Sequence, residues 1–217
     1  MNSTDWMIKR HSVRSYNGLP LTARQAQEIE QKIQAVNQES GQKFQLLVNE
    51  PKAFSGTMAK YGKFSHVVNY IALVGNDERK LGYYGEELVQ YCTNLGLKTC
   101  WVGLTYKKEK NLINIPAGMK LYGVIAVGES DLNGNPHPMR SVTDLMADPN
   151  QQVPDWFTQG MEGVRLAPSA VNQQKYRFSL KDGKPTATAG LGFYTQMDLG
   201  IAQYHFDQAS GHDWFRS

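Results

Sequence analysis

Short apolar runs that alternate with amphipathic stretches are the feature that most limits what this 217-residue chain can fold into. Residues 66–75 (HVVNYIALVG) and 122–130 (YGVIAVGES) are rich in β-branched and other apolar residues, as buried strands are. Between them, residues 83–97 (YYGEELVQYCTNLGL) are predicted to form a helix that a glycine-containing turn closes. This mixture of helices and strands predicts an α+β fold.

The clearest helix is predicted between Thr22 and Gly41. Thr22 is followed three residues later by Gln25, the pattern of a capping box, and Gly41 is a typical residue to end a helix. The apolar residues have the spacing of one buried helix face: Ala26, Ile29, Ile33 and Val36. Residues 43–50 (KFQLLVNE) are then predicted to form a short strand, and residues 99–106 (TCWVGLTY) an extended segment.

A change of character at residues 133–154 predicts an internal boundary. This stretch (NGNPHPMRSVTDLMADPNQQVP) holds four prolines and shows little periodicity, so it is a connector or a surface loop. We therefore expect one domain at 1–132 and a shorter one at 133–217. The elements expected beyond the connector are a helix at 155–167, a strand at 175–185 that ends in an Asp-Gly turn, and a helix at 197–211.

The second part has short similarities to the first. Gln90 precedes Trp101 by eleven residues, the interval that also separates Gln203 from Trp214, and a tyrosine follows the glutamine in both cases. Two further pairs occur in the same order: HSVRSY with RSVTDL, and GQKFQLLV with NQQKYRFSL. These pairs favour two copies of one helix-and-strand unit, the second lacking part of its middle. Chance similarity among common residues is the alternative.

Charge and cysteine content exclude several classes of protein. The formal net charge is only +3 and the basic residues are scattered, unlike those of a surface that binds a nucleic-acid duplex. Cys92 and Cys100, with seven residues between them, suggest neither a disulfide framework nor a zinc-binding pair. No apolar run approaches the roughly twenty residues of a membrane-spanning helix. The expected location is a reducing compartment, by default the cytoplasm, with no membrane or nucleic-acid partner.

A basic cluster near the amino terminus is the first candidate binding segment. Lys9, Arg10, His11 and Arg14 surround the hydroxyl of Ser12. Because like charges repel, either solvent and salt dilute the cluster on an open surface or an anion lies within it. On a helix, Arg10 and Arg14 would share a face, and Ser12 would add a hydroxyl or backbone donor to a bound anion. A solvated basic tail is the other interpretation.

Residues 167–174 form the second candidate segment. Pro168 is predicted to end the preceding helix. Three compact polar side chains follow it: Ser169, Asn172 and Gln174. Such groups suit the polar edge of a heterocycle, and the small Ala167 and Ala170 would let a flat ring approach the backbone. A helix cap and turn uses the same residue types for local backbone bonds, so composition leaves both interpretations open.

These two segments carry a resemblance to a known family. The stretches RHSVR at 10–14 and APSAVNQQKY at 167–176 resemble the two flavin-site segments of the nitroreductase family of FMN-dependent oxidoreductases. Residues 65–75 and 82–103 are similar to the family's strand and to the central helix and loop that follow it. The resemblance implies a nitroreductase-like fold, with antiparallel or mixed sheets flanked by helices, and FMN as the cofactor.

The chain departs from the family pattern in two ways. The second segment usually follows soon after the basic one, whereas here it lies far downstream, and Lys175 and Tyr176 replace the usual Pro-Trp. Common members of the family are homodimers with flavin at the subunit interface. Two fused repeats, at 1–132 and 133–217, would let one chain imitate such a dimer with one shared flavin site. The resemblance therefore implies a two-repeat pseudo-dimer that is monomeric.

The resemblance also implies roles for the candidate residues of the basic segment. The phosphate of FMN would be neutralised by Arg10 and Ser12, together with Arg140 of the connector. Arg14 would lie near N1 and O2 of the ring, where a fixed cation raises the reduction potential. His11 would pack on the ring edge or point to solvent, and it has no metal-ligand partners at a suitable spacing.

Further roles are implied for residues along the ring. The backbone amide of Gly103 would donate to flavin N5, with Val102 beside it and Trp101 either packed on the ring or in the core. The second segment would contact the ring with these residues: Pro168, Ser169, Ala170, Asn172 and Gln174. Lys60 and Lys63 would lie near the phosphate or ribityl chain, or simply favour solubility.

The implied reaction needs no obligatory side-chain acid or base. Hydride would move from NAD(P)H to the flavin and then to an electron-poor acceptor, a nitroaromatic or a quinone, in a ping-pong cycle. No nucleotide-binding glycine motif is present, so the nicotinamide would bind only transiently. The alternatives are a flavin carrier or sensor closed by Lys175 and Tyr176 or by Phe193 and Tyr194, a flavin enzyme of other chemistry, and an interaction module without flavin.

Overall fold

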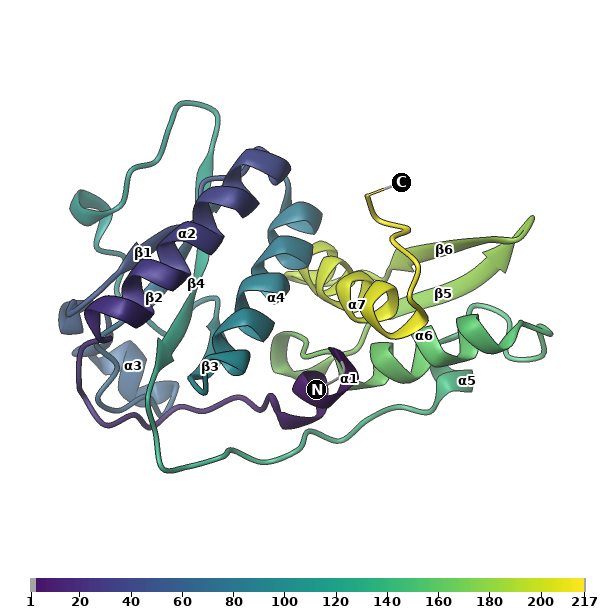
Figure 1. Ribbon diagram of the computed structural model, residues 1–217, viewed down its shortest axis with the longest axis horizontal. Coiled ribbons are helices and arrows are strands. Elements are labelled where there is room, and N and C mark those ends of the chain that lie inside the picture. The colour runs from purple at the N-terminus through teal and green to yellow at the C-terminus, as the bar shows by residue number, and fades with distance from the viewer. Residues whose placement is uncertain (1–2, 217) are drawn as a thin grey trace. The chain divides into compact units, whose positions relative to one another are not determined.

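The computed structural model describes residues 3–216, which group into two compact units (Figure 1). The sheet unit comprises residues 10–77 and 88–136. The hairpin unit comprises residues 3–9, 78–87 and 137–216. The two units are defined by how densely their residues contact one another, which does not test sequence repetition. The division into repeats at 1–132 and 133–217 stays a prediction. No helix in the described part is both long enough and apolar enough to span a membrane.

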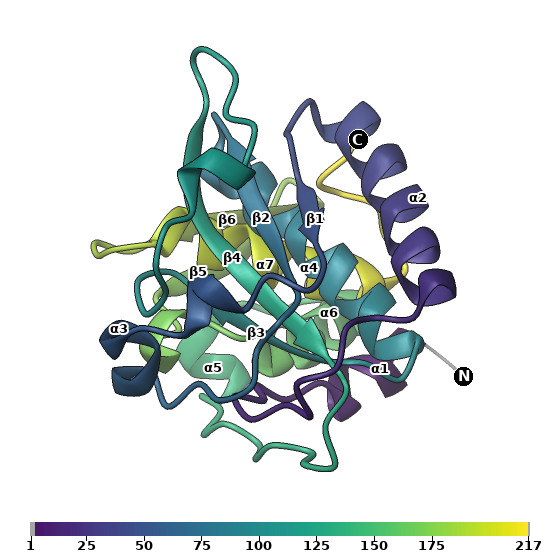
Figure 2. The same ribbon diagram turned by 90° about the vertical axis from the view of Figure 1, so that its left-hand side faces the viewer.

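An antiparallel sheet of four strands forms the centre of the sheet unit (Figure 2). The strands lie in the order β1 (Gln45–Leu47), β2 (Tyr70–Gly75), β4 (Lys120–Gly128), β3 (Lys98–Val102). Every residue of β2 is buried, which agrees with the predicted central strand, and β2 pairs with β4. The predicted strand at 43–50 is observed only as the three residues of β1. The sheet, together with the helices of both units, confirms the α+β prediction.

Helix α2 (Ala23–Ser40) confirms the helix predicted after Thr22. The Thr22 hydroxyl accepts the Gln25 amide N–H at 3.2 Å, the Gln25 side chain accepts the Thr22 amide in return, and Gly41 ends the helix with a φ of 71°. Its apolar face packs beside β1. Three short elements of the sheet unit were not predicted. They are helix α3 (Thr57–Tyr61) and two 3-10 helices, labelled η: η1 (Pro51–Phe54) and η2 (Lys110–Leu112).

The hairpin unit consists of helices packed on a two-stranded hairpin. Its elements are α1 (Ser3–Lys9), α5 (Val142–Leu145), α6 (Asp155–Leu166), η3 (Ala170–Asn172), β5 (Tyr176–Lys181), β6 (Lys184–Ala189) and α7 (Thr195–Ser210). The hairpin turns at Asp182 and Gly183, both with positive φ, so the predicted Asp-Gly turn is confirmed. Strand β6 was not predicted, because Pro185 and a run of Thr and Ala give it no apolar alternation.

Helix α4 (Glu78–Asn94) is continuous, and its residues 78–87 belong to the hairpin unit, where they cross α7 closely. A Cβ atom at Gly82 would lie 2.0 Å from the Met197 backbone oxygen, and one at Gly200 would lie 2.0 Å from the Arg79 backbone oxygen. Both distances are far inside van der Waals contact. Glycine is therefore required at both positions for the two helices to approach this closely.

Candidate functional site

The basic segment lies in the sheet unit as an irregular chain, and not as a helix. Helix α1 ends at Lys9, after which the Val13 amide donates to the Thr99 carbonyl at 3.0 Å and the Ser65 amide donates to the Arg14 carbonyl at 2.9 Å. A shared helix face for Arg10 and Arg14 is therefore wrong. The segment is held by backbone bonds to β3 and to the loop around Ser65, which fixes the positions of its side chains.

The side chains of the basic segment differ in exposure and charge state. Arg10 is 5% exposed, whereas Arg14 is exposed and its guanidinium lies 5.9 Å from the ring centroid of Phe64. The pKa of the His11 imidazole lies below its ordinary value of 6.5, because of partial burial first and of Arg10 and Lys98 second. The imidazole is therefore mainly neutral at pH 7, and the positive charge of the segment belongs to the two arginines.

Strand β3 places the next group of predicted residues. Val102 is buried and pairs with Val124 of β4, while Trp101 is half-buried and points to the other face of the sheet. Gly103 follows the strand, and Gly123 lies directly against it, since a Cβ atom at Gly123 would lie 3.4 Å from the Gly103 Cα atom. Lys60 and Lys63, which were predicted near the phosphate or ribityl chain or as solubilising residues, are both exposed.

Residues 167–174 belong to the hairpin unit and have an unusual backbone. Ala167 takes an extended conformation because Pro168 follows it, and this ends α6 as predicted. Val171, Asn172 and Gln174 all have positive φ, with values of 45°, 56° and 45°. The left-handed region is unfavourable for a β-branched residue such as valine. Strain of this kind persists where surrounding contacts enforce it, which is common at binding sites.

The amides of Asn172 and Gln174 enforce this conformation by binding the connector. Both side chains donate to the Pro138 carbonyl at 2.9 Å, and the Gln174 amide also donates to the Asn172 side-chain oxygen at 2.9 Å. The Gln174 oxygen accepts the Arg140 backbone N–H at 3.0 Å. The hydroxyl of Ser169 accepts the backbone N–H of Gln174 at 3.0 Å and closes the loop. Both amide hydrogens of the Gln174 side chain are therefore used within the protein.

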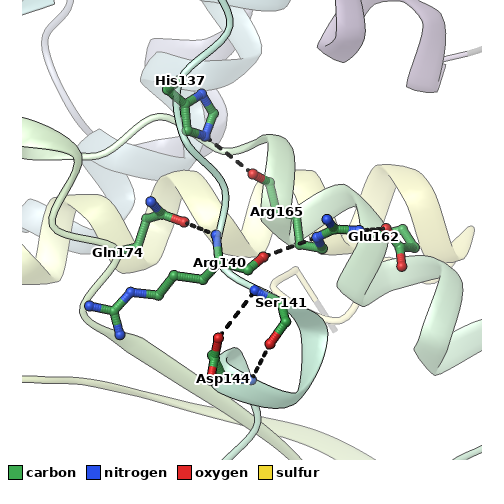
Figure 3. Close-up of polar contacts among 7 residues, drawn as sticks. All are labelled: His137, Arg140, Ser141, Asp144, Glu162, Arg165 and Gln174. Atoms are coloured by element: carbon green, nitrogen blue, oxygen red, sulfur yellow. Dashed lines mark hydrogen bonds and ion pairs between the residues drawn. The ribbon is translucent and has the colours of Figure 1, made fainter.

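The connector at 137–141 is fixed on both sides, as Figure 3 shows. The Arg165 guanidinium donates to the Arg140 carbonyl at 3.0 Å, the His137 ring contacts the Arg165 carbonyl at 3.2 Å, and Ser141 caps α5. The backbone of Arg140 is thus bonded at both its N–H and its carbonyl. Its exposed guanidinium has no hydrogen-bond partner among the residues that the structure describes. A cation on an immobilised backbone is a preorganised ligand for an anion.

Two positioning residues of this segment were not predicted. Asp198, in the first turn of α7, accepts the Ala170 backbone N–H at 2.9 Å and the Gln173 side-chain amide at 2.7 Å. Gln173 lies within the segment itself. No local pattern marks either residue, because the contact joins residues 25 to 28 positions apart. Lys175 is exposed and Tyr176 is fully buried at the start of β5.

The predicted residues thus form two groups, each within its own unit. The hairpin unit brings together Arg140, Pro168, Ser169, Ala170, Asn172 and Gln174, and the sheet unit holds Arg10, His11, Ser12, Arg14, Trp101, Val102 and Gly103. In the first group, a free guanidinium accompanies a strained loop that carries small polar side chains. In the second, two arginines lie on a segment fixed to β3. Both groups suit a ligand that carries negative charge.

Solved structures of similar proteins identify the fold. A "putative nitroreductase" from Thermotoga maritima has a TM-score of 0.68 at 20% identity, over 96% of this chain and 83% of that one. A "putative nitroreductase in complex with FMN" from Desulfovibrio desulfuricans has a TM-score of 0.52 at 15% identity, over 70% and 98%. A "putative NADH dehydrogenase/NAD(P)H nitroreductase" from Parabacteroides distasonis has a TM-score of 0.52 at 17% identity, over 69% and 98%. The fold is that of the nitroreductases.

The sequence identifies the family within this class. Residues 2–210 match the model of the family described as "Putative TM nitroreductase". The chain therefore belongs to this nitroreductase family, which confirms the resemblance found in the two segments. No curated protein is significantly similar in sequence to the chain.

Proposed function

We propose that the protein is an FMN-dependent oxidoreductase that passes hydride from NAD(P)H to an electron-poor acceptor, a nitroaromatic or a quinone, in a ping-pong cycle. Membership of the nitroreductase family supports the flavin and the redox chemistry. Two relatives of the same fold are described as an FMN complex and as an NADH dehydrogenase or NAD(P)H nitroreductase. The observation that carries the proposal is the strained segment 167–174 with its unspent hydrogen-bond donors.

The donors that remain on this segment fit a phosphorylated planar ring. The Ser169 hydroxyl accepts one bond, but its own hydrogen meets no acceptor among the described residues. Asn172 uses one amide hydrogen on Pro138, and no described residue accepts the other. With the guanidinium of Arg140 nearby, the segment offers neutral donors for a ring edge and a cation for a phosphate. These are the groups that FMN requires.

We assign the following roles to the residues of this chain. Arg10, Ser12 and Arg140 bind the phosphate, and Arg14 stabilises negative charge at the N1 and O2 side of the ring. The Gly103 backbone N–H donates to N5, while Ser169 and Asn172 donate to the ring edge. Gln174, whose two side-chain amide hydrogens are both used, positions Asn172 and Arg140. When bound, FMN supplies the group that takes up hydride and releases it to the acceptor.

We also propose that the chain is a pseudo-dimer of two repeats that share this one site. When the short α3 and the 3-10 turns are left aside, the element order α2-β1-β2-α4 recurs as α6-β5-β6-α7. Gly82 contacts Met197, and Gly200 contacts Arg79. Gly200 lies 118 residues after Gly82, and Met197 lies 118 residues after Arg79, so the two contacts join equivalent positions of the two repeats. The similarity between the sequences around Gln90 and Gln203 relates positions that are 113 residues apart. It therefore implies a different alignment of the two repeats from the glycine contacts. The glycine contacts therefore support the repeat more strongly than that similarity.

The proposed location is the cytoplasm, where NAD(P)H is available as the reductant. Both Cys92 and Cys100 are free and buried, which agrees with a reducing compartment. Burial raises the pKa of the Cys92 thiol to about 12, so this thiol is inert at neutral pH. The proposed partners are accordingly small molecules: NAD(P)H and an electron acceptor.

The test begins with the visible spectrum of the purified protein after addition of FMN. We expect a bound flavin spectrum that bleaches on anaerobic addition of NADH or NADPH and returns when a quinone or nitroaromatic is added. A protein that takes up no FMN would refute the proposal. A bound flavin that stays oxidised would refute hydride transfer and favour a carrier or sensor.

A matched pair of variants tests the assigned site. Arg140→Gln removes a free guanidinium, and we expect it to weaken FMN binding about tenfold, the size expected for a hydrogen bond to a charged group. Arg24→Gln removes an exposed arginine of α2 that pairs with Glu28. This control should leave FMN binding unchanged. Equal affinity in both variants would exclude Arg140 from the site.

A further inference from the structure

Gln173 connects three parts of the hairpin unit through one amide. Its Nε2 donates to the Asp198 carboxylate at 2.7 Å and to the Phe193 carbonyl at 2.9 Å. A primary amide has two hydrogens, so both are used. The residue lies inside the segment 167–174, Asp198 lies in α7, and Phe193 belongs to the loop 190–194 that precedes α7. The segment, the loop and the helix are thus joined at one side chain.

The carboxylate of Asp198 is the acceptor on which this junction depends. Its second oxygen accepts the Ala170 backbone N–H at 2.9 Å, so each oxygen holds a different part of the segment. The side chain is 3% exposed. Burial, with a smaller contribution from Glu78 of α4, raises the pKa of Asp198 to about 6, against the two hydrogen bonds that lower it. The charge of Asp198 in turn raises the pKa of the Tyr176 hydroxyl of β5, after the larger effect of burial.

The loop 190–194 is fastened to the segment by further bonds. The Gly190 amide donates to the Lys175 carbonyl at 2.7 Å, and the Lys175 ammonium donates to the Leu191 carbonyl at 3.1 Å. Leu191 is 95% exposed and Phe193 is 53% exposed. The loop therefore holds two large apolar side chains in solvent while its backbone is bound to Gln173 of the segment and to Lys175, which follows the segment.

We propose that Asp198 is a positioning residue of the flavin site, which through Gln173 holds the segment 167–174 and the loop 190–194 as one body. The inference rests on the proposed function. The ionised carboxylate accepts from Ala170 with one oxygen and from Gln173 with the other. In the protonated acid the hydroxyl oxygen is a weaker acceptor and its hydrogen competes with one of these two donors. That bond is weakened, and the strained backbone of the segment relaxes.

The charge state of Asp198 thus controls how well the segment binds FMN. The affinity for FMN should fall as the pH falls through about 6, because protonation breaks the junction. The phosphate of FMN itself has a second pKa of about 6, so the wild-type profile alone does not isolate Asp198. A variant that cannot titrate at this position separates the two effects, because the phosphate contributes equally to both proteins.

The experiment compares FMN dissociation constants from fluorescence titrations between pH 5 and pH 8. Asp198→Asn keeps the size of the side chain, but its NH2 group must face one of the two donors, either the Ala170 N–H or the Gln173 amide. We expect roughly tenfold weaker binding than wild type at pH 8, the size of a lost hydrogen bond to a charged group. At pH 5 the ratio should approach one. A role confined to stability would give a ratio that does not change with pH.

Two further variants complete the design. Gln173→Leu removes the junction while Asp198 remains, and it should also weaken FMN binding severalfold at pH 8. Asp131→Asn, at an exposed aspartate of the sheet unit, is the charge-matched control and should bind as wild type does. If both Asp198→Asn and Gln173→Leu bind FMN with wild-type affinity, the inference about Asp198 is overturned but the proposed function is not. A wild-type protein that binds no FMN would overturn the proposed function, and the inference with it.

Discussion

At the scale of the residue, the side-chain amides of the second segment hold its own backbone and the connector together. Composition left open whether Asn172 and Gln174 meet a heterocycle or bind local backbone. The structure shows that both side chains bind the carbonyl of Pro138, and that Gln174 also accepts the Arg140 amide. Asn172 retains an unused donor and Gln174 does not. Of these two residues of the motif, only Asn172 keeps an amide hydrogen for the ligand binding that we propose.

The role of Gln174 leads to a prediction. Gln174→Leu leaves the Arg140 N–H without its acceptor and removes one of the two donors to Pro138. We expect the free energy of unfolding to fall by about 1–3 kcal/mol, the cost of unsatisfied polar groups. FMN binding should weaken because the Arg140 backbone then keeps its bond to Arg165 but loses the one to Gln174. Denaturant unfolding and flavin titration measure the two effects. Gln196→Leu, at an exposed position of α7, is the control.

At the scale of the element, the crossing of α4 and α7 depends on two glycines. Each of them faces a backbone carbonyl of the other helix at a distance that leaves no room for a methyl group. The buried surface of α7 extends around the helix and includes the polar side chains of Gln203, His205 and Asp207. His205 lies 3.0 Å from the Glu86 carboxylate of α4, and both are fully buried. The crossing is thus a packed interface with a polar centre.

The crossing makes substitution at Gly82 or Gly200 costly. Gly82→Ala should lower the free energy of unfolding by about 3 kcal/mol or more, because the methyl group would meet a backbone oxygen that cannot rotate away. Gly56→Ala is the matched control, since a Cβ atom there meets no atom within 4 Å, and it should change stability by less than about 0.5 kcal/mol. Thermal and urea unfolding of the three proteins provide the measurement. Similar stability of Gly82→Ala and Gly56→Ala would contradict the close crossing.

The elements also show what the sequence could and could not predict. Helix α2 was predicted with its caps, since Thr22, Gln25 and Gly41 act through contacts within four residues. Strand β6 was missed because its residues are not apolar, and it is a strand only through pairing with β5. For the candidate site, motif resemblance predicted roles for residues 10–14 and 167–174, and those roles stay a proposal. It did not find Asp198, because hydrogen bonds between distant residues leave no periodic signal.

At the scale of the whole molecule, buried carboxyl groups influence how stability depends on pH. Asp207 of α7 accepts the Tyr83 hydroxyl at 3.0 Å and the Phe215 amide at 3.0 Å, and it is 3% exposed. Burial raises its pKa to about 6, as it does for Asp198. The folded protein therefore binds protons more tightly at these positions than the unfolded chain, in which the pKa is near 3.8.

The sign of the pH effect follows from this difference. Between pH 4 and pH 6 the folded state carries more protons on Asp207, so the contribution of this residue to the free energy of unfolding falls as the pH rises. Asp207→Asn does not titrate in this range. We expect the stability of wild type minus that of Asp207→Asn to decrease from pH 4 to pH 6 and to level off above about pH 7. Urea unfolding at each pH measures the difference, and a rise with pH would contradict the burial of this carboxyl.

The path of the chain through the two units restricts how the protein can be dissected. The backbone passes from one unit to the other after residues 9, 77, 87 and 136. A fragment that begins at residue 137 would retain α7 but lack Gly82, Tyr83 and Glu86, which pack against it. No single cut of the polypeptide liberates either unit intact. Recombination between relatives should therefore succeed only when it exchanges several separate stretches together.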